Sequence, residues 1–341
     1  MKKKIIYPKV GGPESIKIVE IKHKKIGENQ VRIRVHRAGI NFADLMMRQG
    51  LYGTAPEFPF TPGYEISGVI SELGPEVKNL KIDQRVIGLT GFGGYSEEVI
   101  IDSMRVMPIP DNVSFDQAAA IPVTYCTAYH MLIYLGNLQK GDSILIHHAA
   151  GGVGTAAAQI CQNYGAGMII GTASESKKEF VESLGMYFID KDKEDFVDIC
   201  KGLTNGRGVH QALDPVAGKH LLKSYKSLRN GGKLHIFGAS SAVPRKTRSI
   251  FAALKMLKTT PKFNPLDMMN SNKSIFGVHM GRITDEEIFR NHLLVLSELM
   301  SKKAINPIID SVWRFEKVSE AHIHMHNRKN RGKILLDFSP I

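Results

Sequence analysis

The feature that most constrains this chain is an apolar stretch that leads through a glycine-rich turn into a run of small residues. It reads Ile144-Leu145-Ile146-His147-His148-Ala149-Ala150-Gly151-Gly152-Val153-Gly154-Thr155-Ala156-Ala157-Ala158. This order predicts a buried strand, a tight turn and then a helix. Strands and helices alternate from there on, with strands predicted at 144–146, 168–170, 187–189, 209–213, 234–237 and 275–279, and helices at 152–164, before 185, at 219–228 and at 285–301. The alternation predicts an α/β fold, a doubly wound parallel sheet with helices on both faces.

The glycines of this turn have the spacing of a dinucleotide-binding loop. Against the pattern G-x-G-x-x-G, the turn aligns Ala149, Gly151 and Gly154, with alanine in the first glycine position. A side chain at the second position would block a pyrophosphate, the third glycine lets the helix pack on the strand, and the helix amino terminus offers free N–H groups. We therefore predict a pyrophosphate site, with a ligand-free turn as the alternative, at Ala150, Gly151, Gly152, Val153 and Gly154.

The residues after the second strand favour NADPH over NADH as the cofactor. Proteins that bind NAD place an acidic residue about 20 residues after the turn, where it binds the ribose 2′-hydroxyl. Here that stretch reads Gly171-Thr172-Ala173-Ser174-Glu175-Ser176-Lys177-Lys178. Hydroxyl and ammonium donors suit a 2′-phosphate, which a carboxylate would repel. Thr172, Ser174 and Lys178 are therefore predicted cofactor contacts, whereas Glu175 argues weakly against NADPH and the lysines are alternatively a solvated helix face.

The first hundred residues have a different pattern, that of short antiparallel strands. Val31, Ile33 and Val35 alternate with polar residues, as in a strand with one buried face. Proline and glycine recur up to residue 94, which predicts a compact, barrel-like β domain. Strand-like sequence returns at 308–309, 312–313 and 334–336. With 341 residues, the chain is long enough for two domains of ordinary size.

The positive charge of the chain is concentrated in one segment. There are 45 basic and 33 acidic residues, a net charge of +12, which suggests nucleic acid, an anionic membrane or a phosphorylated ligand as a partner. Residues 215–266 contain no acid and eleven basic residues: Lys219, Lys223, Lys226, Arg229, Lys233, Arg245, Lys246, Arg248, Lys255, Lys258 and Lys262. Nucleic acid is not expected, because no aromatic residues are interleaved with this run. The part 245–258 is also apolar, and either covers a cleft or dimer face, which we favour, or lies on an anionic membrane.

Cysteine content and apolar stretches bear on the compartment. Cys126, Cys161 and Cys200 are too few for a disulfide framework and lack metal-ligand spacing, so a reducing, cytoplasmic environment is expected. The uncharged stretches 117–139 and 143–174 are interrupted by polar residues, glycine or proline, and no membrane span is predicted. The basic amino terminus is not followed by an apolar segment of signal-peptide length.

Several further motifs carry a resemblance to a known family. They are Ala38-Gly39-Ile40-Asn41-Phe42-Ala43-Asp44, Arg48-Gln49-Gly50-Leu51-Tyr52, Thr61-Pro62-Gly63-Tyr64-Glu65 and Gly332-Lys333-Ile334-Leu335-Leu336. With the turn, they make the chain resemble the medium-chain dehydrogenase/reductase superfamily, in its zinc-free quinone oxidoreductase (zeta-crystallin-like) branch. Residues 41–46, 136–139 and 310–318 are most similar to the vesicle amine transport protein (synaptic vesicle membrane protein) homologues.

This resemblance implies a domain arrangement and a partner. A GroES-like β-barrel substrate domain, 1–122 and 282–341, is expected to be split by an inserted Rossmann domain, 123–281, with a cleft between them. The superfamily often dimerises through the last Rossmann strand, here 275–279, so a homodimer is expected. A catalytic zinc needs Cys, His and acidic ligands, but the corresponding positions hold Gly39 and Tyr64. No metal site is therefore predicted.

The resemblance also implies roles for individual residues. Tyr52 and Asn41 would lie at the nicotinamide end of the cleft, where Tyr52 donates a hydrogen bond to a substrate carbonyl oxygen. Met46 replaces a tyrosine of bacterial relatives and makes the pocket more apolar, and Asp44 is expected to orient the loop. Further cofactor contacts are implied at Thr127, at Ser174, Lys178 and Lys191 for the 2′-phosphate, at Phe237, Gly238 and Phe276 around the nicotinamide, and at Asn330 and Lys333 on the last cofactor-facing loop.

These observations predict an NADPH-dependent, zinc-independent oxidoreductase that transfers a hydride to a quinone or an α,β-unsaturated carbonyl. The alternative is an NADPH-binding protein that works at a membrane or binds lipid, with little catalytic activity. A run of three histidines, His322, His324 and His326, remains outside either function. We interpret it as a solvated face of a helix, with a metal pair of His322 and His326 as the less favoured reading.

Overall fold

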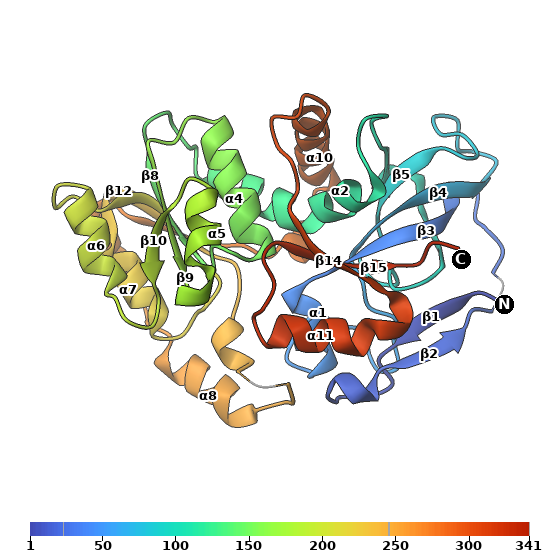
Figure 1. Ribbon diagram of the computed structural model, residues 1–341, viewed down its shortest axis with the longest axis horizontal. Helices are drawn as coiled ribbons and strands as arrows, with labels where there is room; N and C mark the ends of the chain where they lie inside the picture. Colours follow the sequence, from blue (N-terminus) through green and yellow to red (C-terminus); the bar gives the residue numbers. More distant parts are fainter. Residues whose placement is uncertain (23, 245, 341) are drawn as a thin grey trace. The chain divides into compact units, whose positions relative to one another are not determined.

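The computed structural model describes residues 1–22, 24–244 and 246–340. Arg245, one of the eleven basic residues of the segment 215–266, lies outside the described residues. The chain forms two compact units (Figure 1): the first comprises Met1–Val123, Arg245–Arg248 and Glu286–Ile341, and the second Thr124–Pro244 and Ser249–Asp285. The domain limits predicted from the sequence, 1–122 with 282–341 and 123–281, remain a prediction.

The second unit is built on a parallel sheet of six strands. They are β8 (Ser143–His147), β9 (Met168–Ala173), β10 (Tyr187–Asp190), β11 (Val209–Asp214), β12 (Leu228–Ile236) and β13 (Ser274–Gly277). Their spatial order is β10-β9-β8-β11-β12-β13, and every neighbouring pair is parallel. This is the strand order 3-2-1-4-5-6 of dinucleotide-binding sheets, in which the order reverses direction beside the first strand. The predicted Rossmann sheet is confirmed.

Helices connect these strands, because parallel neighbours need a crossover between them. They are α4 (Gly152–Asn163), α5 (Lys178–Ser183), α6 (Phe196–Leu203), α7 (His220–Lys226), α8 (Ile250–Thr259) and α9 (Pro265–Ser271). The helix predicted at 219–228 is too long at both ends, since α7 begins at His220 and ends at Lys226, and Leu228 already begins β12. The core between the sheet and its helices is apolar, with Leu145, Ile170, Ala212 and Leu234 fully buried.

One helical stretch differs from the prediction that no segment is apolar enough to cross a membrane. Phe115–Leu135 is long and apolar enough by length and composition alone. It consists of α2 (Phe115–Ala120), α3 (Cys126–Tyr129) and π-helical turns around α3. Within its most apolar window, 72% is buried inside the fold, as in the core helix of a soluble protein.

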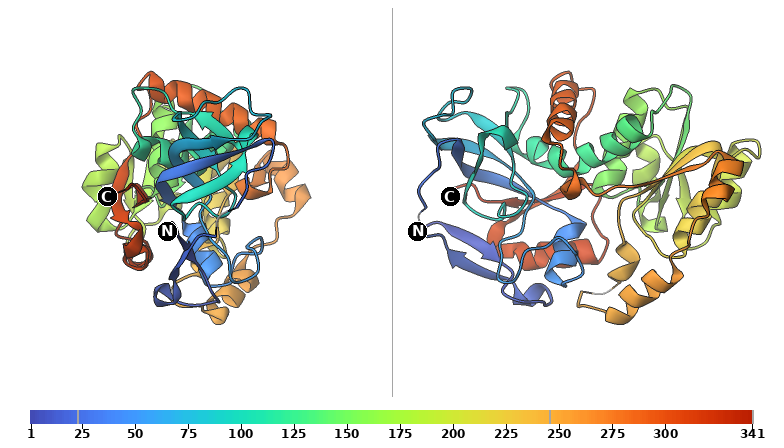
Figure 2. Two further views of the ribbon diagram at one scale, coloured as in Figure 1. Left: turned by 90° about the vertical axis from the view of Figure 1, so that its right-hand side faces the viewer. Right: turned by 180° about the vertical axis from the view of Figure 1, so that it is seen from behind.

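The first unit contains a seven-stranded sheet (Figure 2). It comprises β3 (Gln30–Ile40), β4 (Glu65–Leu73), β5 (Arg85–Leu89), β6 (Glu98–Asp102), β7 (Val106–Pro108), β14 (Ile309–Arg314) and β15 (Lys333–Asp337). The order is β14-β15-β3-β4-β5-β7, β6 also pairs with β3, and only β14 and β15 run parallel. The predicted antiparallel β domain is confirmed, and the two short predicted strands near 310 are one strand, β14.

Smaller elements complete the first unit. They are β1 (Lys3–Ile6), β2 (Lys17–Glu20), α1 (Phe42–Arg48), α10 (Glu286–Ser301) and α11 (Val318–His326). Val31, Ile33 and Val35 are fully buried in the core, as predicted, but Arg32 between them is also buried, where it forms ion pairs with Glu72 and Glu98. β6 pairs with the first half of β3 and β15 with its second half, while β4 pairs on the other side, so the end of β3 lies between β15 and β4.

Candidate active site

The glycine-rich turn joins β8 to α4 in the second unit. Gly151 precedes the helix with an extended backbone, φ −84° and ψ 174°. A Cβ atom on Gly154 would lie 2.4 Å from the carbonyl oxygen of Ala149, so no side chain fits there. A Cβ atom on Gly151 would lie 3.3 Å from the carbonyl oxygen of His148 and is tolerated only if that carbonyl shifts. The turn is therefore bare on the side of the free N–H groups of α4, which suits a pyrophosphate.

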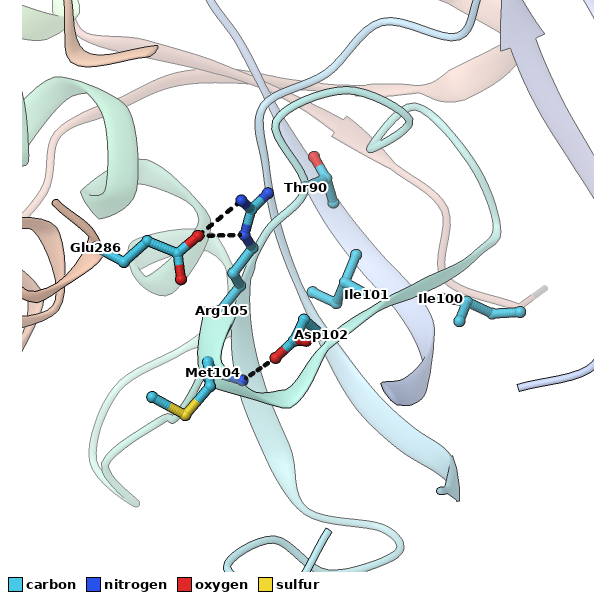
Figure 3. A pocket seen from close by; sticks show the side chains of 7 residues that line it. All are labelled: Thr90, Ile100, Ile101, Asp102, Met104, Arg105 and Glu286. Carbon is cyan, nitrogen blue, oxygen red and sulfur yellow. Dashed lines mark hydrogen bonds and ion pairs between the residues drawn. The ribbon is translucent and has the colours of Figure 1, made fainter. Parts of the chain in front are cut away.

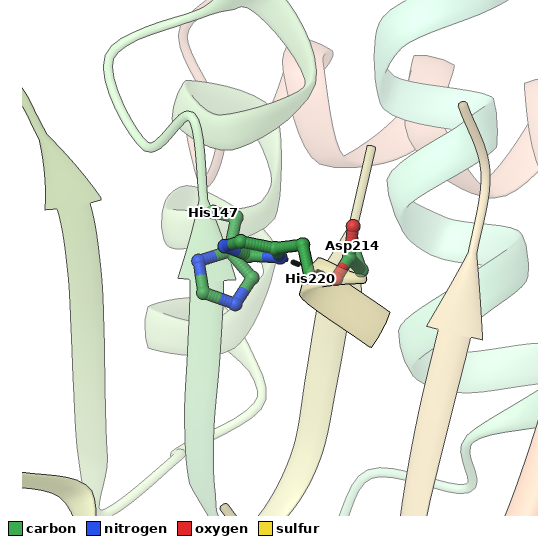
Figure 4. Close-up of side chains that lie close together, drawn as sticks. All are labelled: His147, Asp214 and His220. Atoms are coloured by element: carbon green, nitrogen blue, oxygen red, sulfur yellow. Dashed lines mark hydrogen bonds and ion pairs between the residues drawn. The ribbon is translucent and has the colours of Figure 1, made fainter. Parts of the chain in front are cut away.

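A buried hydrogen-bonded chain ties together the strand ends beside this turn (Figure 4). Nδ1 of His147 lies 3.0 Å from Oγ1 of Thr172, and its Nε2 lies 3.1 Å from Oγ of Ser224. Ser224 donates to Oδ2 of Asp214 (2.6 Å), which also lies 2.8 Å from Nδ1 of His220. Burial lowers the pKa of His147 to about 3, so the imidazole is neutral. Thr172, a predicted cofactor contact, thus has its hydroxyl held by His147.

The same side chains have the composition of a metal site. Ligand atoms of His147, Asp214 and His220 lie within 4.8 Å of one another. Both ring nitrogens of His147 and both oxygens of Asp214 already take part in hydrogen bonds. Burial raises the pKa of Asp214, but the hydrogen bonds with His220 and Ser224 and the two nearby histidines together outweigh it and hold that pKa below its usual value. The group is therefore a satisfied polar network, and the absence of a metal stays a prediction.

The predicted 2′-phosphate residues follow β9 and β10. Ser174 precedes a short 3₁₀ turn, and its Oγ lies 3.3 Å from Oγ of Ser176. Lys178 begins α5. Lys191 differs from the prediction in one respect: its Nζ lies 2.6 Å from each carboxylate oxygen of Asp192, so it already has a counterion. Glu175, which argued against NADPH, forms an ion pair with Lys193 at 3.3 Å.

The other predicted cofactor residues of the second unit are apolar or uncharged. Thr127 is buried in α3. Phe237 and Gly238 directly follow β12. Phe276 lies within β13 and stacks on His235, with ring centroids 5.2 Å apart and planes 13° apart. These placements are compatible with the predicted roles but do not test them.

In the first unit, Asn41 and Lys333 lie together with a residue to which the sequence analysis gave no role, Glu65. Lys333 donates to Oδ1 of Asn41 (2.7 Å) and to Oε1 of Glu65, and Asn41 donates to the same Oε1 (2.9 Å). Lys333 was predicted on a loop, but it is the first residue of β15, and Glu65 is the first residue of β4. Glu65 ends one of the motifs that carry the family resemblance, Thr61-Pro62-Gly63-Tyr64-Glu65, but nothing in that motif indicates its role.

Asp44 fixes the backbone of Asn41. Its Oδ2 accepts hydrogen bonds from the N–H of Asn41 (2.8 Å) and from the hydroxyl of Tyr95 (2.9 Å). Asp44 is fully buried, and burial raises its pKa to about 7. These contacts agree with the expectation that Asp44 orients the loop.

Tyr52 lies in an aromatic cluster on the same unit. It is half-buried and packs against the buried cluster of Tyr7, Met47 and Phe60, as Phe58, Tyr64 and Phe92 also do. Burial, together with the side-chain interaction with Tyr52, raises the pKa of Tyr64 above its usual range. Tyr64 occupies a position at which zinc-dependent relatives would supply a ligand, so the structure pairs the predicted catalytic tyrosine with a second one.

The histidine run proved different from the solvated face that we predicted. All three histidines lie on α11, but His322 is fully buried, and its Nδ1 lies 2.8 Å from Nη1 of Arg48. Nε2 of His326 lies 2.9 Å from Nη2 of the same arginine, and Nε2 of His324 lies 2.9 Å from Oδ2 of Asp310. The buried guanidinium of Arg48 therefore takes the place of the metal considered for His322 and His326.

A surface cavity of about 340 Å³ lies elsewhere on the first unit (Figure 3). It is lined by Thr90, Ile100, Ile101, Asp102, Met104, Arg105 and Glu286. Arg105 crosses it to form an ion pair with Glu286 at 2.8 Å. None of the predicted site residues lines this cavity, so we do not assign it to the active site.

Two family models match the chain. The model described as alcohol dehydrogenase GroES-like domain matches residues 27–111, and the model described as zinc-binding dehydrogenase matches residues 152–297. The synaptic vesicle membrane protein VAT-1 homologue of Homo sapiens is 38% identical over 312 residues, 91% of this chain and 79% of that protein. The chain belongs to the medium-chain dehydrogenase/reductase superfamily. Quinone oxidoreductase-like protein 2 of Mus musculus, 31% identical over 95% of this chain and 89% of its own length, places it in the zinc-free, quinone-oxidoreductase-like branch near the VAT-1 homologues.

Solved structures of this superfamily have the same fold. Quinone oxidoreductase of Escherichia coli, determined with NADPH, aligns with a TM-score of 0.86 and 27% identity over 98% of this chain and 99% of that one. The CurK enoyl reductase aligns with a TM-score of 0.84 and 26% identity over 98% and 99% of the two chains. The predicted combination of a GroES-like and a Rossmann domain is thereby confirmed.

Proposed function

We propose that this protein is an NADPH-dependent, zinc-independent oxidoreductase that reduces a quinone or an α,β-unsaturated carbonyl compound. The observation that carries the proposal is the bare glycine-rich turn at the end of β8, beside which the strand order of the sheet reverses. Dinucleotides bind at this point of such sheets. The likeness to a quinone oxidoreductase determined with NADPH and to an enoyl reductase supports the cofactor and both acceptor classes.

The residues of the chain would bind and orient the reactants. Bound NADPH supplies a hydride from C4 of its nicotinamide. The turn from Ala150 to Gly154 would hold the pyrophosphate, and Ser174 and Lys178 the 2′-phosphate. Tyr52 would donate a hydrogen bond to the acceptor oxygen, which gains negative charge during reduction. One proton from solvent completes the reduction of the acceptor.

A fluorescence titration with NADPH and NADH tests the cofactor, and a panel of quinones and enones tests the acceptor. We expect NADPH to bind at least about tenfold more tightly, because a 2′-phosphate forms charge-assisted hydrogen bonds with Ser174 and Lys178. Lys178→Ala should reduce the preference for NADPH over NADH without changing the affinity for NADH. Tighter binding of NADH would refute the argument from these two residues, and turnover of neither acceptor class would refute the enzymatic proposal.

The quaternary structure and compartment are proposed on narrower grounds. β13 pairs with β12, and no strand of the described residues lies on its other side, which leaves an edge that a second copy can extend. We propose a homodimer formed there, which light scattering at micromolar concentration tests through the mass of the particle.

The cysteines bear on the compartment. All three are free and buried, which supports a reducing compartment such as the cytoplasm. Fractionation of cells tests this proposal.

A second candidate function, binding to an anionic membrane, is favoured by the segment 249–271. It contains α8 and α9, and six of its large apolar side chains are exposed, Phe251 by 78%. The others are Ile250, Leu254, Leu257, Leu266 and Met269. Lys255, Lys258 and Lys262 are exposed among them, and Asp267 is the only acid. Apolar and basic side chains together suit the interface of an anionic bilayer. The apolar side chains insert between the lipids, and the basic side chains contact the anionic headgroups.

Sedimentation with vesicles tests this second function. We expect binding to phosphatidylserine-containing vesicles that weakens at high salt and is lost in Phe251→Ser/Leu257→Ser, and no binding to vesicles of phosphatidylcholine alone. Leu222→Ser, which alters an exposed leucine on α7, is the matched control and should bind normally. If the double variant instead becomes monomeric while wild type does not bind vesicles, the segment covers a second copy of the chain and the membrane function is refuted.

A further inference from the structure

The side chain of Asn41 is held by a closed triangle of polar groups in the first unit. Asn41 follows β3, Glu65 begins β4 and Lys333 begins β15, and β3 lies between the other two strands. The three side chains are joined pairwise: Lys333 to Asn41 at 2.7 Å, Asn41 to Glu65 at 2.9 Å, and Lys333 to Glu65 in an ion pair. Three adjacent strands thus converge on one amide.

This triangle is buried. The exposed fraction is 0% for Glu65, 3% for Lys333 and 8% for Asn41. The second carboxylate oxygen of Glu65 accepts a hydrogen bond from the N–H of Val123 at 2.7 Å, so both oxygens are used. A buried carboxylate or ammonium is costly unless its partner and its hydrogen bonds are in place. If either Glu65 or Lys333 lost its partner, the remaining charged side chain would therefore move out of this buried position.

The contacts leave Asn41 a single orientation. An ammonium only donates hydrogen bonds and a carboxylate only accepts them, so Oδ1 of Asn41 must face Lys333 and Nδ2 must face Glu65. A flipped amide would set donor against donor and acceptor against acceptor. The second hydrogen on Nδ2 has only a long contact, 3.5 Å, with the carbonyl oxygen of Gly39. The third hydrogen of Lys333 has no partner among the described residues.

Gly39 makes room for this arrangement. A Cβ atom there would lie 2.3 Å from Oε1 of Glu65, the oxygen on which both donors meet. Gly39 stands at a position where a zinc-dependent relative would have a metal ligand. Where such relatives hold a metal ion, this chain therefore has a glycine, and the carboxylate behind it faces a lysine ammonium.

We propose that Glu65 is a positioning residue of the active site, which holds the Asn41 amide and the Lys333 ammonium in the orientation that the reactants meet. The inference rests on the proposed oxidoreductase function, in which Asn41 and Lys333 are predicted to contact the cofactor. Glu65 touches neither reactant and acts through these two residues. Its removal frees the amide and leaves the ammonium without its counterion.

The test is Glu65→Gln, assayed for NADPH affinity, kcat, KM and thermal unfolding. We expect kcat to fall about 10- to 100-fold, as for other misplaced groups, while the Kd for NADPH changes less than about threefold, since the second unit binds the phosphates. Glu65→Asp keeps the charge and should retain more activity. Glu65→Gln/Lys333→Met has no buried charge within the triangle and should regain thermal stability without regaining kcat.

Glu98→Gln is the matched control. Glu98 is also shielded from solvent and paired with a cation, Arg32 at 2.6 Å, in the same sheet but outside the triangle. It should lose stability and keep kcat. If Glu65→Gln does not fold, Glu65→Asp and the double variant supply the kcat values. Wild-type kcat in Glu65→Gln or in the double variant, or an equal loss in Glu98→Gln, overturns this inference and leaves the proposed function standing. Wild-type protein that binds NADPH and reduces no acceptor overturns both.

Discussion

The two units organise their predicted sites in opposite ways. In the second unit, the turn from Ala150 to Gly154 is one continuous piece of sequence, and its backbone N–H groups offer the binding surface. In the first unit, Asn41, Glu65 and Lys333 lie at the ends of three strands and are up to 292 positions apart, and their side chains contact one another directly. A site built from the backbone depends on the absence of side chains at a few positions, whereas a site built from side chains depends on charges that balance one another.

The largest effect is expected where the backbone site is filled. Gly154→Val places a branched side chain where a single Cβ atom would already lie 2.4 Å from the carbonyl oxygen of Ala149. We expect NADPH affinity to fall at least about 100-fold, because α4 must move away from β8. A fluorescence titration measures this. Gly202→Ala, in α6, meets nothing within 4 Å and should bind NADPH normally. If Gly154→Val bound NADPH normally, the second unit would not bind the cofactor through a bare backbone turn, and the contrast between the two units would be wrong.

A smaller effect is expected from one methyl group in the side-chain site. Gly39→Ala puts Cβ 2.3 Å from Oε1 of Glu65, whose carboxylate is anchored by Val123 and Lys333 and has to give way. We expect kcat to fall about tenfold with little change in NADPH affinity, because the proposed contacts of the cofactor phosphates all belong to the other unit. Steady-state kinetics beside a titration separates the two quantities. A loss of NADPH affinity with kcat unchanged would contradict this prediction, because it would mean that the triangle in the first unit serves cofactor binding instead of catalysis.

The same contrast explains what the sequence could predict. The Rossmann sheet and its turn follow from local periodicity and glycine spacing, so every strand of the sheet was predicted, and the helix 152–164 nearly to the residue, although β12 begins six residues before its predicted start. Glu65 was not found, because its role depends on β3 lying between β4 and β15, which local sequence does not encode. His322 was misread for the same reason: its partner Arg48 is 274 positions away. The resemblance to a family identified Asn41, Tyr52 and Lys333 as site residues, but it did not identify the contacts that hold them in place.

Protonation offers a further way to sharpen the comparison, through stability instead of activity. Burial raises the pKa of Asp44 from 3.8 to about 7 in the folded protein. Between those values the folded state holds a proton that the unfolded state releases, so this group stabilises the fold at low pH and loses that contribution as pH rises to about 7. Asp44→Asn should remove a slope of up to about 1.4 kcal/mol per pH unit from the free energy of unfolding.

Urea unfolding of wild type and Asp44→Asn across this range measures the difference between their slopes. The comparison with wild type is needed because the buried histidines titrate in the opposite sense: burial lowers the pKa of His147 to about 3, so its contribution is lost as pH falls. Tyr95 remains able to donate to the oxygen of an asparagine at position 44, so the variant keeps that contact. Parallel curves for the two proteins would show that Asp44 does not titrate there.

The smallest effect is expected at Lys191, and it tests how far similarity alone reaches into the backbone-built site. Lys191 was expected to bind the 2′-phosphate, but its ammonium lies 2.6 Å from both oxygens of Asp192, so a phosphate would have to compete with a carboxylate already in place. Lys191→Ala should therefore weaken NADPH binding less than about threefold, since exposed ion pairs are worth little. Lys178→Ala, titrated in parallel, should have the larger effect. If the order is reversed, the phosphate displaces Asp192, and Asp192→Asn should then tighten NADPH binding while leaving NADH binding unchanged.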